Sequence, residues 1–531
     1  MRVPLAAAIV VLALSSPSFA QLENVGSLSF PTSGSPEAQR HFLRGVAILH
    51  SFGWKQAIVE FKRAQQAQPD FAMAYWGETL CYNHPLNALS DDKNPRAVLA
   101  RLGASRAARL AKAPTSREKG FLDAVEELWA EGPGWRARKV AYMHAMERLH
   151  KQFPGDDEVA TFYALSLLSG ARALNDDTFR LEMKAGALGL DVFKRNPNHP
   201  GAVHYVIHAF DDPVHAPLAL DAARVYAKIV PAVSHAIHMP THIFIQHGMW
   251  PEVAHQNVRA FNVARDLFEP GDSPGDMAHS GDWGQYGFLQ LGDWETARER
   301  IRTFEELAAT TKHPRLSSVV ALTRARYVIE TEEWRVESVA DDAPEETVFA
   351  NGVSAARTGD LATAAKMLAI LEKKAPAAPE TGGDGHADHG GAPAAVSMGG
   401  SNPDAGKSER IMHKQLAAHM AEARGEKDEA IRFVQEAARI EETMRPPNGA
   451  ADPVKPSHEL LGEVLLRAGK ADEAAKAFDA CLLRMPNRAR SLHGASVAHA
   501  AAGHRELSTE RLNALRSFWK GRPFSTTSID R

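Results

Sequence analysis

Residues 196–255 read NPNHPGAVHYVIHAFDDPVHAPLALDAARVYAKIVPAVSHAIHMPTHIFIQHGMWPEVAH, and the spacing of the histidines in this stretch indicates the fold. The stretch holds nine of the chain's 24 histidines. His204 and His238 are separated by 34 positions, and so are His208 and His242. A period of 34 residues is typical of a two-helix repeat that stacks into a solenoid. Two successive repeats are therefore expected to carry the same histidine pair at the same position.

The two ends of the chain carry the repeat pattern most clearly. Two sets of residues share the spacing A-x3-F-x2-A-x4-P, with a cysteine replacing one alanine in the second set: Ala57, Phe61, Ala64, Pro69 and Ala474, Phe478, Cys481, Pro486. Small residues suit close helix crossings, and the phenylalanine fills the hole beside them. The composition is rich in Ala, Leu, Glu and Arg and has few alternating β-branched runs, which favours an all-α protein.

On these motifs most of the mature chain resembles the tetratricopeptide repeat proteins. The segment H-A-x-H-M-P-x-H-I-F at residues 235–244 is also similar to one shared by a group of exported bacterial repeat proteins. The resemblance implies an all-α helical-repeat solenoid, a superhelix of helix-turn-helix units. In such repeats the first helix of each unit lines a concave groove, where a protein or peptide ligand is expected to bind.

The chain divides into five segments. We expect a signal peptide at 1–20, N-terminal repeats at 36–115, central repeats with a histidine-rich groove at 116–375, a flexible linker at 376–408 and C-terminal repeats at 409–531. The linker is rich in Gly, Ala, Pro and His and lacks hydrophobic periodicity, so it cannot offset the entropy of ordering a backbone.

The N-terminus has the pattern of a secretory signal peptide. Arg2 precedes an apolar run from Leu5 to Leu14, which is too short to span a bilayer. Small residues at Ser18 and Ala20 suit a cleavage site, so we expect export to the periplasm or the outside. No later stretch approaches the roughly 18 apolar residues of a membrane span.

The repeated histidines form chelating pairs. Residues four apart lie one turn apart on the same helix face, and neighbouring helices pack about 8–10 Å apart. Both pairs are therefore expected to face one volume in the groove and to bind a transition-metal ion. Imidazole ligands suit several metals, of which we favour zinc and copper. The predicted ligand set is His204, His208, His238, His242, His235 and Asp211, the last as a ligand or as the partner of a histidine.

Two features of this region leave alternatives open. His279 and Asp282 lie three residues apart in the next unit, which makes them candidates for a second metal site. Pro240 lies inside the proposed second histidine helix. A proline there either kinks the helix or marks the place where a helix begins.

Three classes of function fit these observations. The formal net charge of −4 and the lack of a dense basic patch argue against nucleic-acid binding. The sequence also contains no G-x-S-x-G, Walker, H-E-x-x-H or C-x-x-C motif. We favour an exported binding or scaffold protein whose groove holds a transition metal and a partner. The alternatives are a metal-dependent hydrolase or oxidoreductase that uses the same histidines, and a metal-free peptide-binding scaffold. Whether the protein is an enzyme depends on an open coordination position, which is a matter of geometry.

Overall fold

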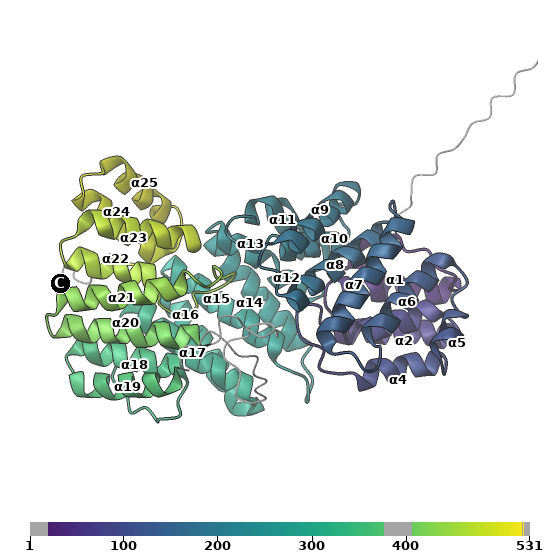
Figure 1. Cartoon of the computed structure of the whole chain (residues 1–531), viewed down its shortest axis with the longest axis horizontal. Helices are drawn as coiled ribbons and strands as arrows, with labels where there is room; N and C mark the ends of the chain where they lie inside the picture. Colours follow the sequence, from purple (N-terminus) through teal and green to yellow (C-terminus); the bar gives the residue numbers. More distant parts are fainter. Residues whose placement is uncertain (1–19, 376–405, 523, 525–531) are drawn as a thin grey trace, which may run out of the picture.

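Antiparallel helix pairs make up most of the described chain (Figure 1). The computed structural model describes residues 20–375, 406–522 and 524. The predicted signal peptide, apart from Ala20, and the predicted linker, apart from residues 406–408, lie outside the described residues.

The elements follow one another in three groups. The N-terminal group holds β1 (Ala20–Leu22), β2 (Gly26–Leu28), α1 (Pro36–His50), α2 (Trp54–Ala67), α3 (Ala72–Leu80), α4 (Lys93–Leu102), α5 (Arg106–Leu110), α6 (Ser116–Leu128), α7 (Trp135–Gln152), α8 (Asp157–Leu174) and α9 (Arg180–Arg195). The central group holds α10 (Pro200–Ala209), η1 (Ala216–Ala219), α11 (Leu220–Ile229), α12 (Ser234–His238), α13 (Pro240–Gln246), α14 (Trp250–Asp266), α15 (Gly275–Leu291), α16 (Trp294–Thr311) and α17 (Pro314–Thr331). The C-terminal group holds α18 (Glu345–Thr358), α19 (Leu361–Lys374), α20 (Lys407–Ala423), α21 (Lys427–Glu441), α22 (Ser457–Arg467), α23 (Ala471–Arg484), α24 (Ala489–Ala501) and α25 (Arg505–Arg516).

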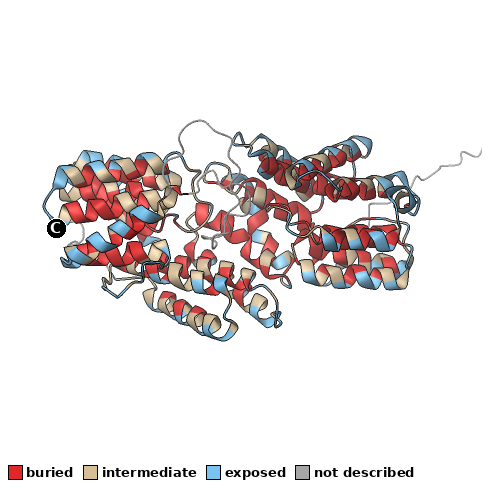
Figure 2. Ribbon diagram, turned by 60° about the horizontal axis from the view of Figure 1, so that its bottom comes forward, coloured by how far each residue is buried: buried red, intermediate tan, exposed pale blue. Residues whose placement is uncertain are grey.

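A phenylalanine seated between two glycines sets how closely these helices stack. Phe61 of α2 packs on Gly45 of α1 and Gly77 of α3, where an added Cβ would lie only 2.9 and 2.2 Å from its ring. The equivalent residues near the other end of the chain are Phe478, Gly462 and Gly494. Buried residues accordingly concentrate where helices face one another (Figure 2). The predicted fold class, an all-α helical-repeat solenoid, is confirmed.

The C-terminal repeats pack back against the middle of the chain. The indole Nε1 of Trp250 donates to the carbonyl of Asn487 at 3.0 Å, and the backbone N–H of Lys520 donates to the carbonyl of Leu291 at 2.8 Å. Cys81 and Cys481 are both free and buried. The C-terminal part of the chain therefore packs directly against α14 and α15.

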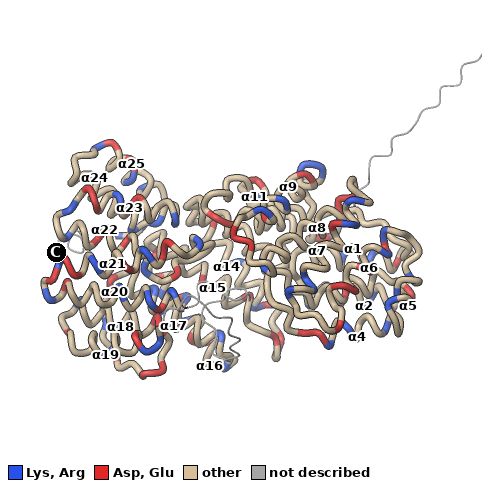
Figure 3. Tube along the Cα trace, viewed as in Figure 1, with Lys and Arg blue, Asp and Glu red and all other residues tan. Residues whose placement is uncertain are grey.

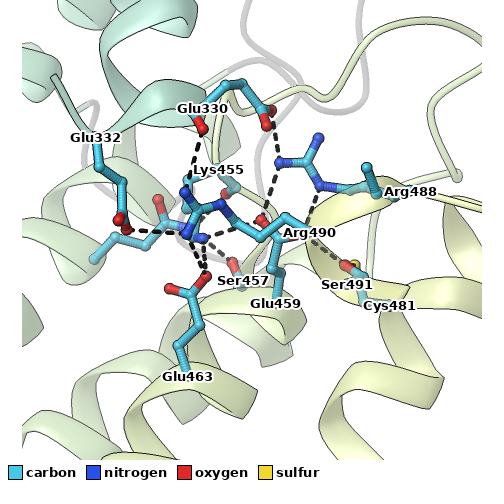
Figure 4. A network of polar contacts seen from close by, with 12 residues as sticks. Glu330, Glu332, Lys455, Ser457, Glu459, Glu463, Cys481, Arg488, Arg490 and Ser491 are labelled. Atoms are coloured by element: carbon cyan, nitrogen blue, oxygen red, sulfur yellow. Dashed lines mark hydrogen bonds and ion pairs between the residues drawn. The ribbon is translucent and has the colours of Figure 1, made fainter. Parts of the chain in front are cut away.

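A buried ion network joins the two halves (Figure 4). Arg488, at the start of α24, donates to both carboxylate oxygens of Glu459 at 2.7 and 2.9 Å and to Glu330 of α17 at 2.6 Å. It also donates to the hydroxyl of Tyr286 in α15 at 3.0 Å. Burial alone would raise the pKa of Glu459, but the charges of Arg488 and Lys455 hold it well below its usual value. These contacts fix the register between the central and C-terminal repeats.

Lysine and arginine residues are interspersed with aspartate and glutamate along the described chain, and neither sign of charge dominates (Figure 3). Within the described part of the chain, no helix combines the length and the apolar character needed to cross a bilayer.

The buried network gives a stability prediction. Replacing Arg488 with alanine leaves the buried carboxylates of Glu459 and Glu330 without their main partner, so we expect a loss of about 3–5 kcal/mol in the free energy of unfolding. Denaturant titration followed by circular dichroism measures this loss. The matched control is Arg432→Ala, which removes an exposed ion pair with Glu429 and should leave the unfolding midpoint nearly unchanged. Equal effects of the two substitutions would contradict the structural role of the network.

Candidate metal centre

Four helices of the central group, α10, α12, α13 and α15, carry the histidines of interest. Helix α10 holds His204 and His208, and it begins at Pro200, whose missing N–H costs nothing in the first turn. Pro240 begins α13, and only Met239, in a right-handed helical conformation, separates it from α12. Each sequence alternative therefore holds in part, because a helix begins at the proline while His235 lies in the helix before it. We call the six residues of this region the histidine site: His204, His208, His235, His238, His242 and His279.

The first trio of ligand groups consists of His204, His208 and His235, whose nitrogens lie within 4.8 Å of one another. The Nε2 atoms of His204 and His235 are 3.1 Å apart. The Nδ1–H of His204 donates to the backbone carbonyl of His50 at 2.6 Å, which orients its Nε2 toward the trio. The Nε2 of His208 is buried and has no hydrogen-bond partner. A buried nitrogen without a hydrogen-bond partner, next to other imidazole nitrogens, suits a metal ligand.

The second trio consists of His238, His242 and His279, again with nitrogens within 4.8 Å of one another. The Nε2 atoms of His238 and His242 are 2.9 Å apart. The Nδ1 of His238 lies 2.6 Å from Oδ1 of Asn257, and the Nδ1 of His242 lies 2.7 Å from Oδ2 of Asp211. Both Nδ1 atoms therefore face oxygen acceptors.

The hydrogen bonds fix the tautomers of the second trio. Asn257 donates its amide N–H to the carbonyl of Val253 at 2.8 Å, so its Oδ1 faces His238 and can only accept. Asp211 likewise accepts from His242 through Oδ2, and the same oxygen accepts the amide N–H of Asn448 at 2.9 Å. Both imidazoles thus carry their proton on Nδ1, and two Nε2 lone pairs face each other. Such a contact is repulsive unless a cation lies between the rings.

Burial keeps five of the six imidazoles of the histidine site neutral. It lowers the pKa of His204 and of His279 to about 3, with smaller contributions from neighbouring histidines. Burial and adjacent imidazoles also hold the pKa values of three further rings well below the usual value: His208, His235 and His238. A neutral imidazole is the form that ligates a metal, so the histidine site is prepared to bind one near neutral pH.

A third trio, His50, Glu158 and His199, shows the contrasting case. Glu158 accepts from His50 Nε2 at 2.9 Å and from His199 Nε2 at 3.1 Å. The remaining ring nitrogens accept in turn, from the hydroxyl of Tyr205 at 2.8 Å and from the backbone N–H of Ala202 at 3.1 Å. Every donor here meets an acceptor. This trio is a satisfied structural network and needs no metal ion.

A segment from the C-terminal repeats, residues 445–450, crosses the histidine site, and we call it the strap. Besides the bond from Asn448 to Asp211, the Pro447 carbonyl accepts from Gln246 of α13 at 3.4 Å. Gly449 packs on the indole of Trp283, where an added Cβ would lie 2.4 Å from the ring. The strap therefore touches the residues that hold His242 in place, although it is about 200 positions away in the sequence.

The strap is anchored beyond the site as well. The guanidinium of Arg445 donates to the carbonyl of Asp176 at 2.7 Å and to the carboxylate of Asp177 at 2.8 Å. It also lies over the ring of Phe179, 4.9 Å from the centroid. These contacts tie the strap to the loop between α8 and α9.

Aromatic rings pack against both trios. Trp283 lies against the second trio, with its centroid 4.3 Å from that of His242. Phe52 stacks on His235 of the first trio at 5.1 Å and 26°. Phe52 has a φ of 57°, a left-handed conformation that costs a non-glycine residue about 1–2 kcal/mol. Strained residues of this kind cluster at functional sites.

The structure distributes the predicted ligands differently from the sequence-based picture. The two chelating pairs fall into different trios, which are completed by His235 and by His279. Asp211 lies behind His242 as its hydrogen-bond partner, which is one of its two predicted roles. Asp282 points to Arg326 at 2.5 Å and lies outside the trios. Sequence reasoning missed Asn257 and the strap, which carry no motif of their own.

Comparisons with known proteins add little to this geometry. No family model and no curated protein sequence matches the chain. Among solved structures the chain is similar to the human IFIT1 dimer with m7Gppp-AAAA, with 12% identity, a TM-score of 0.34, and 92% of this chain and 91% of that one covered. It is also similar to the P58(IPK) TPR domain, with 13% identity, a TM-score of 0.23, and 88% and 98% covered. The APC/C hetero-tetramer Cut9-Hcn1 matches with 14% identity, a TM-score of 0.30, and 88% and 78% covered. Scores this low carry no argument about function.

The third trio gives a prediction about acid stability. Burial alone would raise the pKa of Glu158, but His199 and His50 lower it to about 2 from the ordinary 4.5. The folded-state pKa is depressed, so this carboxylate stabilises the fold above pH 4.5 and the stabilisation is lost as the pH falls toward 2. We expect Glu158→Gln to cost about 3 kcal/mol at neutral pH and progressively less in acid. Urea titrations of both proteins across this range measure the difference, and a difference independent of pH would contradict the assignment.

The strap gives a second prediction. Replacing Gly449 with valine forces the strap away from Trp283, because the new side chain has no room there. In chelator-treated protein, diethyl pyrocarbonate should then modify His279 and His242 several times faster, as read by peptide mass spectrometry. Gly155→Val is the matched control, since a side chain at Gly155 meets nothing within 4 Å. Unchanged modification rates in the Gly449 variant would show that the strap does not cover the histidines.

Proposed function

We propose that this protein is an exported helical-repeat protein that binds a transition metal, zinc or copper, at its histidine site. The proposal rests on one observation in the second trio. The Nε2 atoms of His238 and His242 are 2.9 Å apart, and their lone pairs face each other because both rings donate their Nδ1 protons to Asn257 and Asp211. Two imidazoles on one tetrahedral ion with bonds of about 2.0–2.1 Å have their nitrogens about 3.3 Å apart. A small opening of the pair would therefore turn a repulsive contact into two metal bonds.

The hydrogen bonds behind the ligands support the same proposal. A carbonyl, an amide oxygen and a carboxylate accept the Nδ1–H groups of His204, His238 and His242 in turn. Partners of this kind fix the tautomer and raise the basicity of a metal-ligating histidine. A merely structural histidine has both nitrogens satisfied, as in the third trio.

A metal-dependent enzyme is the second candidate, and the number of ligands favours it. Each trio supplies three imidazoles, and catalytic zinc sites characteristically use three protein ligands and leave a fourth position for water or substrate. Structural zinc sites, in contrast, are closed by four protein ligands. A hydrolase or an oxidoreductase would both use such an open position.

A peptide bound along the histidines is less favoured as the principal function. The strap already contacts this region through Asn448 and Gly449. A protein partner of the scaffold would have to bind elsewhere on the repeats or displace the strap. Export belongs to the proposal because of the signal-peptide pattern that ends at Ala20.

The proposal predicts metal-dependent stability. A bound ion should raise the free energy of unfolding by about 2.7 kcal/mol at a concentration one hundred times the dissociation constant. Replacing His204 and His238 together with alanine should abolish both the bound metal and this increment, as measured by elemental analysis and by thermal melts with and without zinc or copper. The control is His144→Ala, an exposed histidine of α7 outside the site. A double variant that keeps the wild-type metal content would refute the proposal.

A further inference from the structure

The two trios of the histidine site are immediate neighbours. The ring centroids of His208 and His242 are 6.5 Å apart, and those of His235 and His238 are 6.4 Å apart. Each of these pairs takes one member from the first trio and one from the second. Because an imidazole nitrogen stands about 2.0–2.1 Å from its ion, two ions in the trios would lie in one shared volume.

Each trio also has a ligand set and supporting groups of its own. The first trio is oriented by the carbonyl of His50 and covered by Phe52. The second is oriented by Asn257 and Asp211 and covered by Trp283. No histidine is needed twice, so one trio can bind an ion without taking a ligand from the other.

The charge of the site indicates what else it would bind. An imidazole that ligates a metal carries no charge, and the ligands are in contact with the carboxylate of Asp211, which accepts from His242. Arg172 contributes a further positive charge near His208. Two divalent ions would leave a buried excess of positive charge, which is costly unless an anion offsets it. With three protein ligands on each ion, open positions remain where a small anion can bind.

From this geometry we infer that the histidine site is a dinuclear centre, which binds two transition-metal ions at once and a small oxygen-donor anion between them. This inference rests on the proposed metal-binding function. Two-metal sites with ions about 3.5–4 Å apart hold a bridging oxygen in the same way. The ligand class is therefore a hydroxide, a carboxylate or a phosphate that reaches both ions, and the cover of Trp283, Phe52 and the strap favours a small one.

Stoichiometry tests the inference directly. The full chain is stripped with chelator, reloaded with excess Cu(II), desalted and assayed by elemental analysis. We expect two ions per chain in the wild type and one ion each in His208→Ala and in His279→Ala. These two positions suit the test because His208 Nε2 makes no hydrogen bond and His279 is partly exposed, so neither loss should disturb the fold. Circular dichroism checks the fold, and His144→Ala should keep two ions.

Electron paramagnetic resonance of the same samples tests whether the ions are adjacent. Neighbouring Cu(II) ions couple, so the wild type should show a weakened signal per copper, whereas each single variant should show the full signal of an isolated ion. Adding inorganic phosphate should change the wild-type spectrum more than that of either variant. Two copper ions with full uncoupled signals, or one ion in the wild type, would overturn the dinuclear centre and leave the proposed metal binding intact. A wild type that binds no copper and no zinc would overturn the proposed function itself.

Discussion

The packing of a phenylalanine against two glycines is the constraint on which the rest of this structure depends. With no Cβ on Gly45 and Gly77, the ring of Phe61 enters the space between helices that would otherwise stand further apart. The same packing recurs at Phe478, so both ends of the chain use one repeat geometry. Stacking at this spacing brings equivalent positions of successive units side by side, which is what places histidines 34 residues apart into one site.

The histidine site shows how hydrogen bonding separates a structural cluster from a ligand cluster. In the third trio, Glu158 lies between two imidazoles, and each donor meets an acceptor. In the second trio, the protons of His238 and His242 point outward to Asn257 and Asp211, so lone pairs converge inside. The residue types are similar, and the difference lies in where the protons go. Burial strengthens the contrast, because it disfavours the alternative of charging an imidazole.

The site also depends on the closing of the chain upon itself. Arg488 joins the C-terminal repeats to the central helices, because it pairs with both Glu459 and Glu330. The strap belongs to the C-terminal repeats, so this packing also holds it next to the histidine site. A solenoid usually stabilises each repeat through its nearest neighbours only. Here Asn448 reaches Asp211 from the far half of the chain, so the order of the site is coupled to the packing of distant repeats.

The sequence by itself determined the repeat architecture and the histidine pairs, because helical periodicity and a 34-residue period are local properties of the chain. A separation of four residues along a helix predicts that His204 and His208 lie on the same face. In the structure both residues lie in α10 and belong to the first trio. Only the tertiary structure decided how the pairs divide into two trios, since this depends on the break at Pro240 and on the angle between helices. It also decided the roles of Asn257 and Asn448. Neither asparagine belongs to a motif, and only the fold shows that Asn257 directs its side chain to His238 and Asn448 directs its side chain to Asp211.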